Sequence, residues 1–321
     1  MSIKVAVCGC GHWGKNHVRN HAELGSLAAV FDPHAATAQK FADEYNVPAL
    51  SFDDILGNHD IHGVVLASPA HLHASMAIQA LRAGKHVFVE KPLALTVQDA
   101  QNILDEAAAA NRHVMVGHLL QYHAAFIKLK ELVNHDKIIG NLRFINATRV
   151  STGKIRTEEN ALWSFAPHDI SMILSLVGEE PTDVAANGKA ILQQNIEDIV
   201  HVDMQFASGI YAHVTASWLY PDKEHKMIIG GDKGYLVFDD RENFDKKIKL
   251  FRHDIHMNND QPVITKDDEG TYIPVEPSEP LRAECQHFID AIQTNTTPQT
   301  DGAEGMRVLR VLERATEVLH G

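Results

Sequence analysis

The 321-residue chain has few cysteines, no excess of positive charge and no long apolar run. Its cysteines, Cys8, Cys10 and Cys285, are an odd number, and the first two lie in a glycine loop that leaves no room for a disulfide. A reducing compartment is therefore expected. The N-terminus leads directly into a short strand without the apolar core of a signal peptide, and no later stretch has the length of a membrane span. We expect a cytoplasmic protein with no membrane partner.

The net charge of −13 disfavours binding to a polyanion, so nucleic acid is not expected as a partner. A small negatively charged nucleotide is still compatible with it, because helix N-termini and local positive groups bind phosphates. The chain length and a hydrophobic content of 45% are sufficient for two domains, each with its own core.

The first motif is a glycine loop between an expected strand and an expected helix. A buried-strand pattern at residues 3–8 precedes a Gly-x-Gly-x-x-Gly sequence, in which glycines let the backbone approach a pyrophosphate at the helix N-terminus. The next strand, 27–31, ends at Asp32, whose carboxylate can bind an adenosine ribose or cap the following helix. Asp32 would repel a 2′-phosphate and no arginine follows it, so NAD is favoured over NADP. The expected cofactor contacts here are Gly9, Gly11, His12, Trp13, Gly14 and Asp32.

A second motif brings a lysine to the end of a buried strand. The apolar run 87–89 leads into Glu90-Lys91-Pro92, and Pro92 ends the strand because it has no amide proton to donate. In an open parallel sheet the ligand crevice lies beyond the carboxyl ends of the strands. Lys91 is therefore expected to point at bound ligand, although an ordinary surface lysine would give the same local pattern.

Helix and strand patterns alternate over the first part of the chain, which predicts a parallel sheet with right-handed crossovers. Besides those already named, the expected helices are 35–45, 53–57, 73–83, 97–110 and 124–134, and the expected strands are 62–67 and 113–116. The loop 68–73 contains His71 and His73, but no third ligand is in view, so no metal site is expected.

Beyond about Gly140 the pattern changes to strands rich in β-branched and aromatic residues, at 142–151, 183–192, 199–206, 210–219, 225–230 and 235–239. One helix, 166–177, has Trp163, Ser164 and His168 at or near its start. Residues 241–279 are expected to be loop with short strands, followed by amphipathic helices at 281–293 and 303–319.

The expected fold is therefore α/β, with two domains. Residues 1–121 form an N-terminal Rossmann dinucleotide-binding domain, and residues 122–321 form a C-terminal α+β domain with an open, mostly antiparallel sheet. Helices cover only one face of that sheet, so we expect a homodimer or homotetramer built on the other face.

Several motifs occur along the chain in the same order as in a known family. Besides the glycine loop they are Ser68-Pro69 with His73, residues 83–87 running into Glu90-Lys91-Pro92, His168-Asp169-Ile170, and Glu279-Pro280-Leu281 followed by His287-Phe288. Over nearly its whole length the chain resembles the glucose-fructose oxidoreductase/inositol dehydrogenase/MocA (Gfo/Idh/MocA) family. The resemblance implies NAD(P)-dependent oxidation or reduction of sugars, and a C-terminal sheet that often forms the subunit interface. Segment 160–169 is most similar to UDP-sugar 3-dehydrogenases, among them those that act on UDP-N-acetylglucosamine for lipid A or surface polysaccharide biosynthesis.

Oxidation of a secondary alcohol requires a base for the hydroxyl proton and a positive group for the developing alkoxide. His168, of a residue type with an ordinary pKa of about 6.5, is expected as the base, and Lys91 as the positive group that also holds the nicotinamide ribose. The roles could be exchanged, since a desolvated lysine can also act as a base. A buried core histidine is the alternative for His168.

The remaining expected contacts fall into two sets. Cofactor contacts include Ser68, Pro69, His71, His73, Glu90 and Gln121. Substrate contacts are Tyr122, Arg149, Lys154, Arg156, Trp163 and Ser164, in addition to Lys91 and His168. Three of these, Arg149, Lys154 and Arg156, are suited to a diphosphate, with a solvated loop as the alternative.

One position departs from the family pattern. Many members carry an aspartate four residues before the catalytic histidine, and this chain has Ser164 there. Serine supplies no negative charge, so a carboxylate-oriented imidazole from that position is excluded. Asp169 faces about a quarter-turn away and is expected to be structural.

Two other classes of protein fit the same motifs. A dehydrogenase of a free sugar or polyol such as an inositol would need no diphosphate site. A non-catalytic dinucleotide-binding regulator would keep the glycine loop and Asp32 but has no reason to keep Lys91 and His168 together.

Overall fold

The structure, a computed structural model, describes residues 2–321 and forms two compact units. The first unit extends to Tyr122 and includes Glu279–Leu309, and the second comprises His123–Ser278 and Arg310–Gly321. The sequence assigns residues 279–309 to the second domain, whereas the structure groups them with the first. The reason is helix α8 (Pro280–Thr294), whose Phe288 and Ile289 belong to the core of the first unit.

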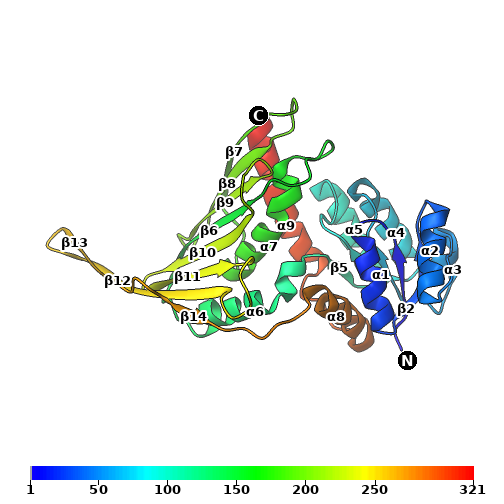
Figure 1. Ribbon diagram of the computed structural model, residues 1–321. Helices are drawn as coiled ribbons and strands as arrows, with labels where there is room; N and C mark the ends of the chain where they lie inside the picture. The colour runs from blue at the N-terminus through cyan, green and yellow to red at the C-terminus, as the bar shows by residue number, and fades with distance from the viewer. Residues whose placement is uncertain (1) are drawn as a thin grey trace. The chain divides into compact units, whose positions relative to one another are not determined.

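The first unit contains a five-stranded sheet in which every pairing is parallel (Figure 1). Its order is β2-β1-β3-β4-β5, with β1 Val5–Cys8, β2 Leu27–Phe31, β3 Gly63–Leu66, β4 His86–Val89 and β5 Val114–Val116. The connecting helices are α1 Gly14–Glu23, α2 Ala35–Tyr45, α3 Phe52–Gly57, α4 His73–Arg82 and α5 Val97–Ala110, with short 3-10 turns η1 Ala70–Leu72 and η2 Leu119–Tyr122. This is the predicted Rossmann-like arrangement.

Local sequence signals account for these elements. Strands β1, β3 and β5 are buried at every position, as is typical of parallel sheets covered on both faces. Helix α5 begins where Thr96 Oγ1 accepts the backbone N–H of Asp99 at 3.0 Å, and it ends at Asn111 with a left-handed φ of 51°. The result is a rigid sheet whose strands share one carboxyl edge, where a dinucleotide binds in such folds.

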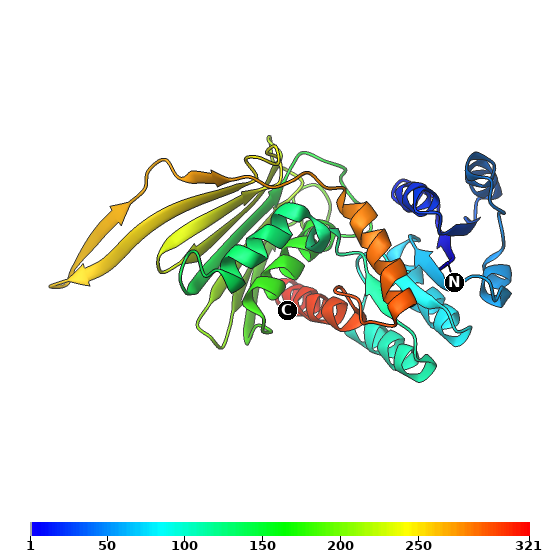
Figure 2. The same ribbon diagram turned by 90° about the horizontal axis from the view of Figure 1, so that it is seen from below.

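The second unit is built on a nine-stranded, mostly antiparallel sheet in the order β13-β12-β11-β10-β6-β9-β8-β7, with β14 paired to β12. Its parallel pair is β6 with β9. The strands are β6 Leu142–Val150, β7 Asp183–Lys189, β8 Ile199–Gln205, β9 Tyr211–Ser217, β10 Glu224–Gly231, β11 Gly234–Asp239, β12 Ile248–Asn258, β13 Gln261–Lys266 and β14 Thr271–Ile273. The helices are α6 Ala124–Lys130, a π-helical turn η3 Glu131–His135, α7 Ala161–Val177 and the C-terminal part of α9 Gly302–His320. Figure 2 shows α6 and α7, in green, against one face of the sheet.

The two faces of this sheet differ. Met227 and Leu236 are buried, whereas their neighbours Ile228 and Val237 point to the opposite face and are only partly buried. That outer face also carries polar groups, among them His213, whose Nδ1 lies 2.7 Å from Asp203 Oδ1. It is therefore more mixed than the apolar face that the sequence predicts. A homodimer or homotetramer built on it remains a prediction.

Two segments differ from the sequence-based expectations. Helix α7 begins at Ala161 rather than near residue 166, because the Asn160 side chain caps it by accepting the N–H of Trp163 at 3.3 Å, with Pro167 inside the helix. Residues 241–279, expected to be loop with short strands, contain three strands, of which β12 is 11 residues long. Of these, β12 and β13 form the long hairpin at the far left of Figure 1.

The cysteines and the helices bear on the expected location of the protein. Cys8, Cys10 and Cys285 are buried and carry free thiols. Within residues 2–321, no helix is both long and apolar enough to cross a membrane. A cytoplasmic location remains a prediction.

Candidate active site

The glycine loop joins β1 to α1 in a geometry that requires its first and third glycines. Gly9 has a φ of 97°, and a Cβ there would lie 2.7 Å from the carbonyl oxygen of Ala67. A Cβ on Gly14 would lie 1.8 Å from the carbonyl oxygen of Gly9. In contrast, a Cβ on Gly11 would meet no atom within 4 Å. The loop is thus closely packed against the end of β3 and has open space in front of Gly11. Such space allows the backbone to approach a phosphate.

Asp32 is anchored at the end of β2 by two backbone groups. Its Oδ2 accepts the N–H of Cys10 at 2.8 Å, and its Oδ1 accepts the N–H of His34 at 2.9 Å. The carboxylate borders a pocket of about 340 Å³ with largely apolar walls, lined by Gly9, Gly11, Phe31, Asp32, Pro33, Phe52, Ala67, Ser68, Pro69, Leu72 and Met76. An apolar slot with one fixed carboxylate suits an adenosine, since the slot would hold the base and Asp32 would accept hydrogen bonds from the ribose hydroxyls.

Ser68 lines this pocket, and His73 contacts the loop that carries Ser68. The Ser68 hydroxyl oxygen is buried and has no hydrogen-bond partner within the described residues. His73 is 1% exposed, and its ring nitrogens lie 2.8 Å from Pro92 O and 2.9 Å from Ser68 O. Burial lowers the pKa of His73, so the neutral ring donates to one of these carbonyls at a time. His73 therefore braces the loop after β3 against the turn after β4 rather than lining the pocket.

The polar groups around this pocket suit NAD. The first unit supplies an unpartnered Ser68 hydroxyl, an anchored carboxylate, and the N-terminus of α1, whose first turn contains no acidic residue. Trp13, at that N-terminus, is 41% exposed, and His12 and His71 are also exposed. Bound NAD would therefore be held by Asp32, Ser68 and the amides of the glycine loop.

Lys91 follows the last residue of β4 by two positions, at the same carboxyl edge as the glycine loop. Val89 is buried, whereas Glu90 and Lys91 are partly exposed. The backbone N–H of Lys91 donates to Glu90 Oε2 at 3.3 Å, and the Lys91–Pro92 peptide bond is cis. The strand end thus delivers Lys91 to the edge that the sequence predicts.

Gln121 and Tyr122 lie after β5 and are almost fully buried. Gln121 is 2% exposed, and its carbonyl accepts a hydrogen bond from Gln299 Nε2 at 3.3 Å. Tyr122 is 5% exposed, and its hydroxyl lies 3.1 Å from Thr300 Oγ1. Its ring belongs to the core of the first unit. This placement gives no support to a sugar contact by Tyr122, and we do not propose one.

In the second unit, α7 presents neighbouring residues to different surroundings. His168 is partly exposed, whereas Asp169 is 2% exposed and faces β6. There Arg149 Nε donates to Asp169 Oδ2 at 2.5 Å and Arg149 Nη2 donates to Asp169 Oδ1 at 3.1 Å. This bidentate pair ties α7 to the sheet one residue from His168.

The predicted diphosphate contact of Arg149 has to be revised. Arg149 is 6% exposed, and its Nη1 lies 3.1 Å from His225 Nδ1 in addition to the two bonds to Asp169. A buried guanidinium with these partners serves the packing of α7. Removing one partner of such a pair typically costs about 3–5 kcal/mol because the other charge remains buried.

The other predicted substrate residues of this unit are distributed along the loop before α7 and its first turn. Lys154 and Arg156 are exposed, and Arg156 Nε lies 3.5 Å from Glu159 Oε1. Trp163 is partly exposed, and its Nε1 donates to Thr316 Oγ1 at 3.0 Å. Ser164 is partly exposed on the same helix as His168. These positions are compatible with a diphosphate site, which remains a proposal.

Some polar residues near Lys91 were not identified from the sequence. His17 is fully buried on α1, and its Nε2 lies 2.6 Å from Glu90 Oε1. Glu284 of α8 is 1% exposed, and its two carboxyl oxygens have no hydrogen-bond partner among residues 2–321. The only available signal was a polar residue on the apolar face of an amphipathic helix, which does not say what its partner is.

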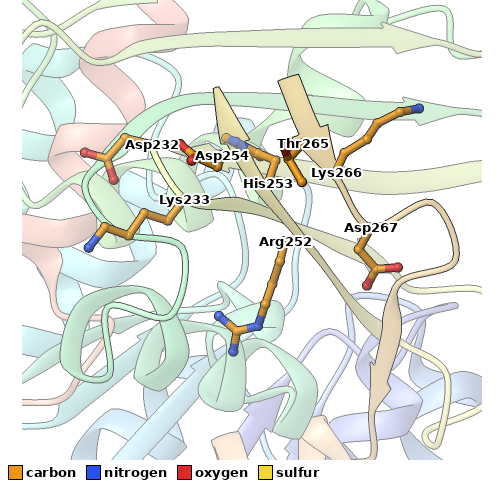
Figure 3. A pocket seen from close by; sticks show the side chains of 8 residues that line it. All are labelled: Asp232, Lys233, Arg252, His253, Asp254, Thr265, Lys266 and Asp267. Carbon is orange, nitrogen blue, oxygen red and sulfur yellow. The ribbon is translucent and has the colours of Figure 1, made fainter. Parts of the chain in front are cut away.

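A further hollow of about 560 Å³ lies between the β12–β13 hairpin and the turn that joins β10 to β11 (Figure 3), lined by Asp232, Lys233, Arg252, His253, Asp254, Thr265, Lys266 and Asp267. Figure 3 shows the cationic groups of Lys233, Arg252 and Lys266 pointing in three different directions. They therefore do not converge on one anion, and none of the predicted site residues lines this hollow.

Comparison with known proteins identifies the family. Residues 3–118 match the oxidoreductase family with an NAD-binding Rossmann fold, and residues 126–237 match the GFO/IDH/MocA C-terminal domain. The chain belongs to the Gfo/Idh/MocA family of oxidoreductases and is an NAD-dependent enzyme. Both the Rossmann unit and the second sheet are thereby accounted for.

Similar proteins within the family are named for different substrates. A UDP-N-acetylglucosamine 3-dehydrogenase from Acidithiobacillus ferrooxidans is 27% identical over 311 residues, which cover 96% of this chain and 95% of the relative. A solved structure of the enzyme of that name from the same organism superimposes with a TM-score of 0.87 at 25% identity, covering 99% of this chain and 98% of that one. An inositol 2-dehydrogenase from Rhizobium meliloti is 24% identical over 98% of this chain and 96% of its own length.

Proposed function

We propose that this protein oxidises the 3-hydroxyl of a UDP-sugar, with UDP-N-acetylglucosamine as the preferred substrate. The observation that carries the proposal is the similarity to a UDP-N-acetylglucosamine 3-dehydrogenase, which extends through both domains rather than the Rossmann domain alone. The exposed cations Lys154 and Arg156, in the loop before α7, support a diphosphate-bearing substrate.

The proposed chemistry divides two tasks between two residues. Bound NAD supplies the hydride acceptor. His168 accepts the proton of the reacting hydroxyl, since the residue is partly exposed and of a type that changes protonation near neutral pH. Lys91 stabilises the negative charge that develops on the oxygen, since it lies at the carboxyl edge of the Rossmann sheet.

The Arg149–Asp169 pair supports this assignment by a route different from the usual family aspartate. With Ser164 in that position, no carboxylate lies one turn before His168. The bidentate bond from Arg149 to Asp169 instead fixes the turn of α7 that carries His168. Both are positioning residues in this proposal.

The second candidate is a dehydrogenase of a free sugar or polyol. It is favoured by the similarity to inositol 2-dehydrogenase over nearly the whole chain. A regulator without catalytic activity is disfavoured, since the family is one of oxidoreductases.

A substrate panel tests the proposal. The purified protein is incubated with NAD and with UDP-N-acetylglucosamine, other UDP-sugars, free N-acetylglucosamine or myo-inositol, and the reduced cofactor is followed by absorbance. Turnover of UDP-N-acetylglucosamine well above the free sugars is expected, with loss of turnover in Lys91→Ala. Efficient oxidation of inositol without activity on any UDP-sugar would establish the second candidate instead.

A further inference from the structure

The carboxylate of Glu90, the residue directly before Lys91, is held from two sides. Its side chain is 13% exposed. Oε1 accepts a hydrogen bond from Trp13 Nε1 and lies in hydrogen-bond contact with His17 Nε2, both at 2.6 Å. Oε2 accepts the backbone N–H of Lys91, and a Cβ added to Gly117 would come within 2.8 Å of it. Glu90 thus joins helix α1 to the backbone of Lys91, and the close approach of Gly117 leaves its carboxylate no room to rotate.

A cysteine on α8 continues this chain of hydrogen bonds. Cys285 Sγ lies 3.6 Å from His17 Nδ1, and both residues are fully buried. Burial raises the pKa of Cys285 well above its ordinary value, and the negative charge of Glu90 adds to this, so the thiol keeps its proton and donates it to Nδ1. The Nε2 of His17 therefore carries the ring proton and donates to Glu90. Cys285 selects the tautomer that Glu90 requires.

The surroundings of Glu90 favour its charged form. Burial alone would raise its pKa, but the hydrogen bonds from His17 and Trp13 and the charge of Lys91 bring the pKa below its ordinary value. The ionisable groups that face it are His17 of α1, His73 of α4, Glu284 and Cys285 of α8, and the adjacent Lys91. Glu284 adds no second negative charge, because burial and the charges of Glu90 and Glu304 raise its pKa well above its ordinary value. Glu90 is thus an anion with a neutral acid beside it.

The same region contains a group of residue types that bind metals. Ligand atoms of His17, His21 and Cys285 lie within 4.8 Å of one another. A metal would require the Cys285 thiol to lose its proton, which its burial opposes, and the hydrogen bonds already use both ring nitrogens of His17. Hydrogen bonding therefore accounts for this cluster better than a metal does.

We propose that Cys285 and His17 are positioning residues, which hold the Glu90 carboxylate and through it fix the place and the positive charge of Lys91. The inference rests on the role of Lys91 in the proposed function. Glu90 restrains the Lys91 backbone directly and stabilises the charged ammonium by proximity. Lys91 then serves as the electrostatic group, which leaves the base to His168.

Chemical labelling of Lys91 tests this without a sugar substrate. The rate at which a brief pulse of acetic anhydride acetylates Lys91 is measured against pH by peptide mass spectrometry. In Glu90→Gln the midpoint of this profile is expected to fall by about 1 pH unit or more, because the neighbouring negative charge is gone. His17→Phe and Trp13→Phe each remove one donor to Glu90 and should move the midpoint the same way by a smaller amount.

Controls separate this inference from the proposed function. Glu106→Gln removes a surface carboxylate paired with Arg82 and should leave the Lys91 profile unchanged. With an active substrate, His17→Phe should lower kcat about tenfold or more while NAD affinity changes little. Trp13→Phe changes an exposed residue and keeps the test readable should the buried variants fail to fold. Unchanged labelling profiles in Glu90→Gln and Trp13→Phe would overturn the inference, whereas failure of every UDP-sugar would overturn the proposed function and leave the labelling result standing.

Discussion

The anchored carboxylate of Asp32 predicts a strong preference for NAD over NADP. Both of its oxygens are tied to backbone N–H groups at 2.8 Å and 2.9 Å, so it cannot swing away from a 2′-phosphate. At about 4 Å and an effective dielectric constant near 20, each unit of like charge costs roughly 4 kcal/mol before screening by salt. Allowing for screening, we expect a difference of about 2–4 kcal/mol, or about 30- to 1,000-fold in Kd.

The substitution Asp32→Ala removes this repulsion and also the ribose contact. A hydrogen bond to a charged acceptor contributes about 1.5–3 kcal/mol, so NAD binding should weaken by about 10- to 150-fold while NADP binding does not weaken to the same extent. Asp32→Asn is the matched variant, because it removes the charge but keeps an amide oxygen for one of the two backbone donors.

Affinities of NADH and NADPH for each variant can be measured by fluorescence titration at fixed ionic strength. The ratio of the Kd of NADPH to the Kd of NADH should be smaller in both variants than in the unmodified protein. In the unmodified protein this ratio should also decrease at high salt. Equal affinity of the unmodified protein for both cofactors would refute the reading of Asp32.

Three further predictions concern the base, the buried acid and the sheet. His168→Asn should lower turnover by about 10²- to 10⁴-fold, leave NAD affinity nearly intact and remove the near-neutral limb of the pH–rate profile. Near-normal turnover with the same limb would show that the base is Lys91 or another group. Glu284 keeps its proton in the folded protein after the unfolded chain has lost it, so wild-type stability should fall by up to about 1.4 kcal/mol per pH unit above the ordinary carboxyl pKa. The unfolding free energy of Glu284→Gln minus that of wild type, measured by urea titration, should therefore increase from pH 5 to pH 8. A difference that stays constant over this range would contradict the prediction. Light scattering at micromolar concentration should give a dimeric or tetrameric mass that Ile228→Glu, on the outer face, reduces; a monomeric wild type would count against this.

The first unit was predictable because its information is local. Strand and helix periods, the glycine spacing and helix caps such as Thr96 each act within a few residues, so the parallel order and the position of Lys91 followed from them. The β12–β13 hairpin was not predictable in the same way. Beyond Phe251 its residues are mostly exposed on both faces, so no alternation of apolar and polar residues marks this part of the hairpin.

The polar contacts of the site could not be read from the sequence. Arg149 and Asp169 are 20 residues apart, and His17 and Glu90 are 73 apart, so only the fold brings them together. For Tyr122 the position was predicted but the direction of its side chain was not. It follows β5 at the predicted edge, but its hydroxyl contacts Thr300, 178 residues later, and its ring enters the core. Position at a strand end predicts which edge a residue occupies and not which way its side chain turns.

The central claim is that hydride leaves carbon 3 of a UDP-sugar for NAD. UDP-N-acetylglucosamine deuterated only at carbon 3 of the sugar, incubated with the protein and NAD, tests it most directly by mass spectrometry of the reduced cofactor. The account predicts that the deuterium appears at the nicotinamide ring, that turnover slows relative to the unlabelled sugar when chemistry limits the rate, and that Lys91→Ala transfers little or none. Reduced cofactor that carries no deuterium, formed at the full rate from the labelled sugar, would contradict it.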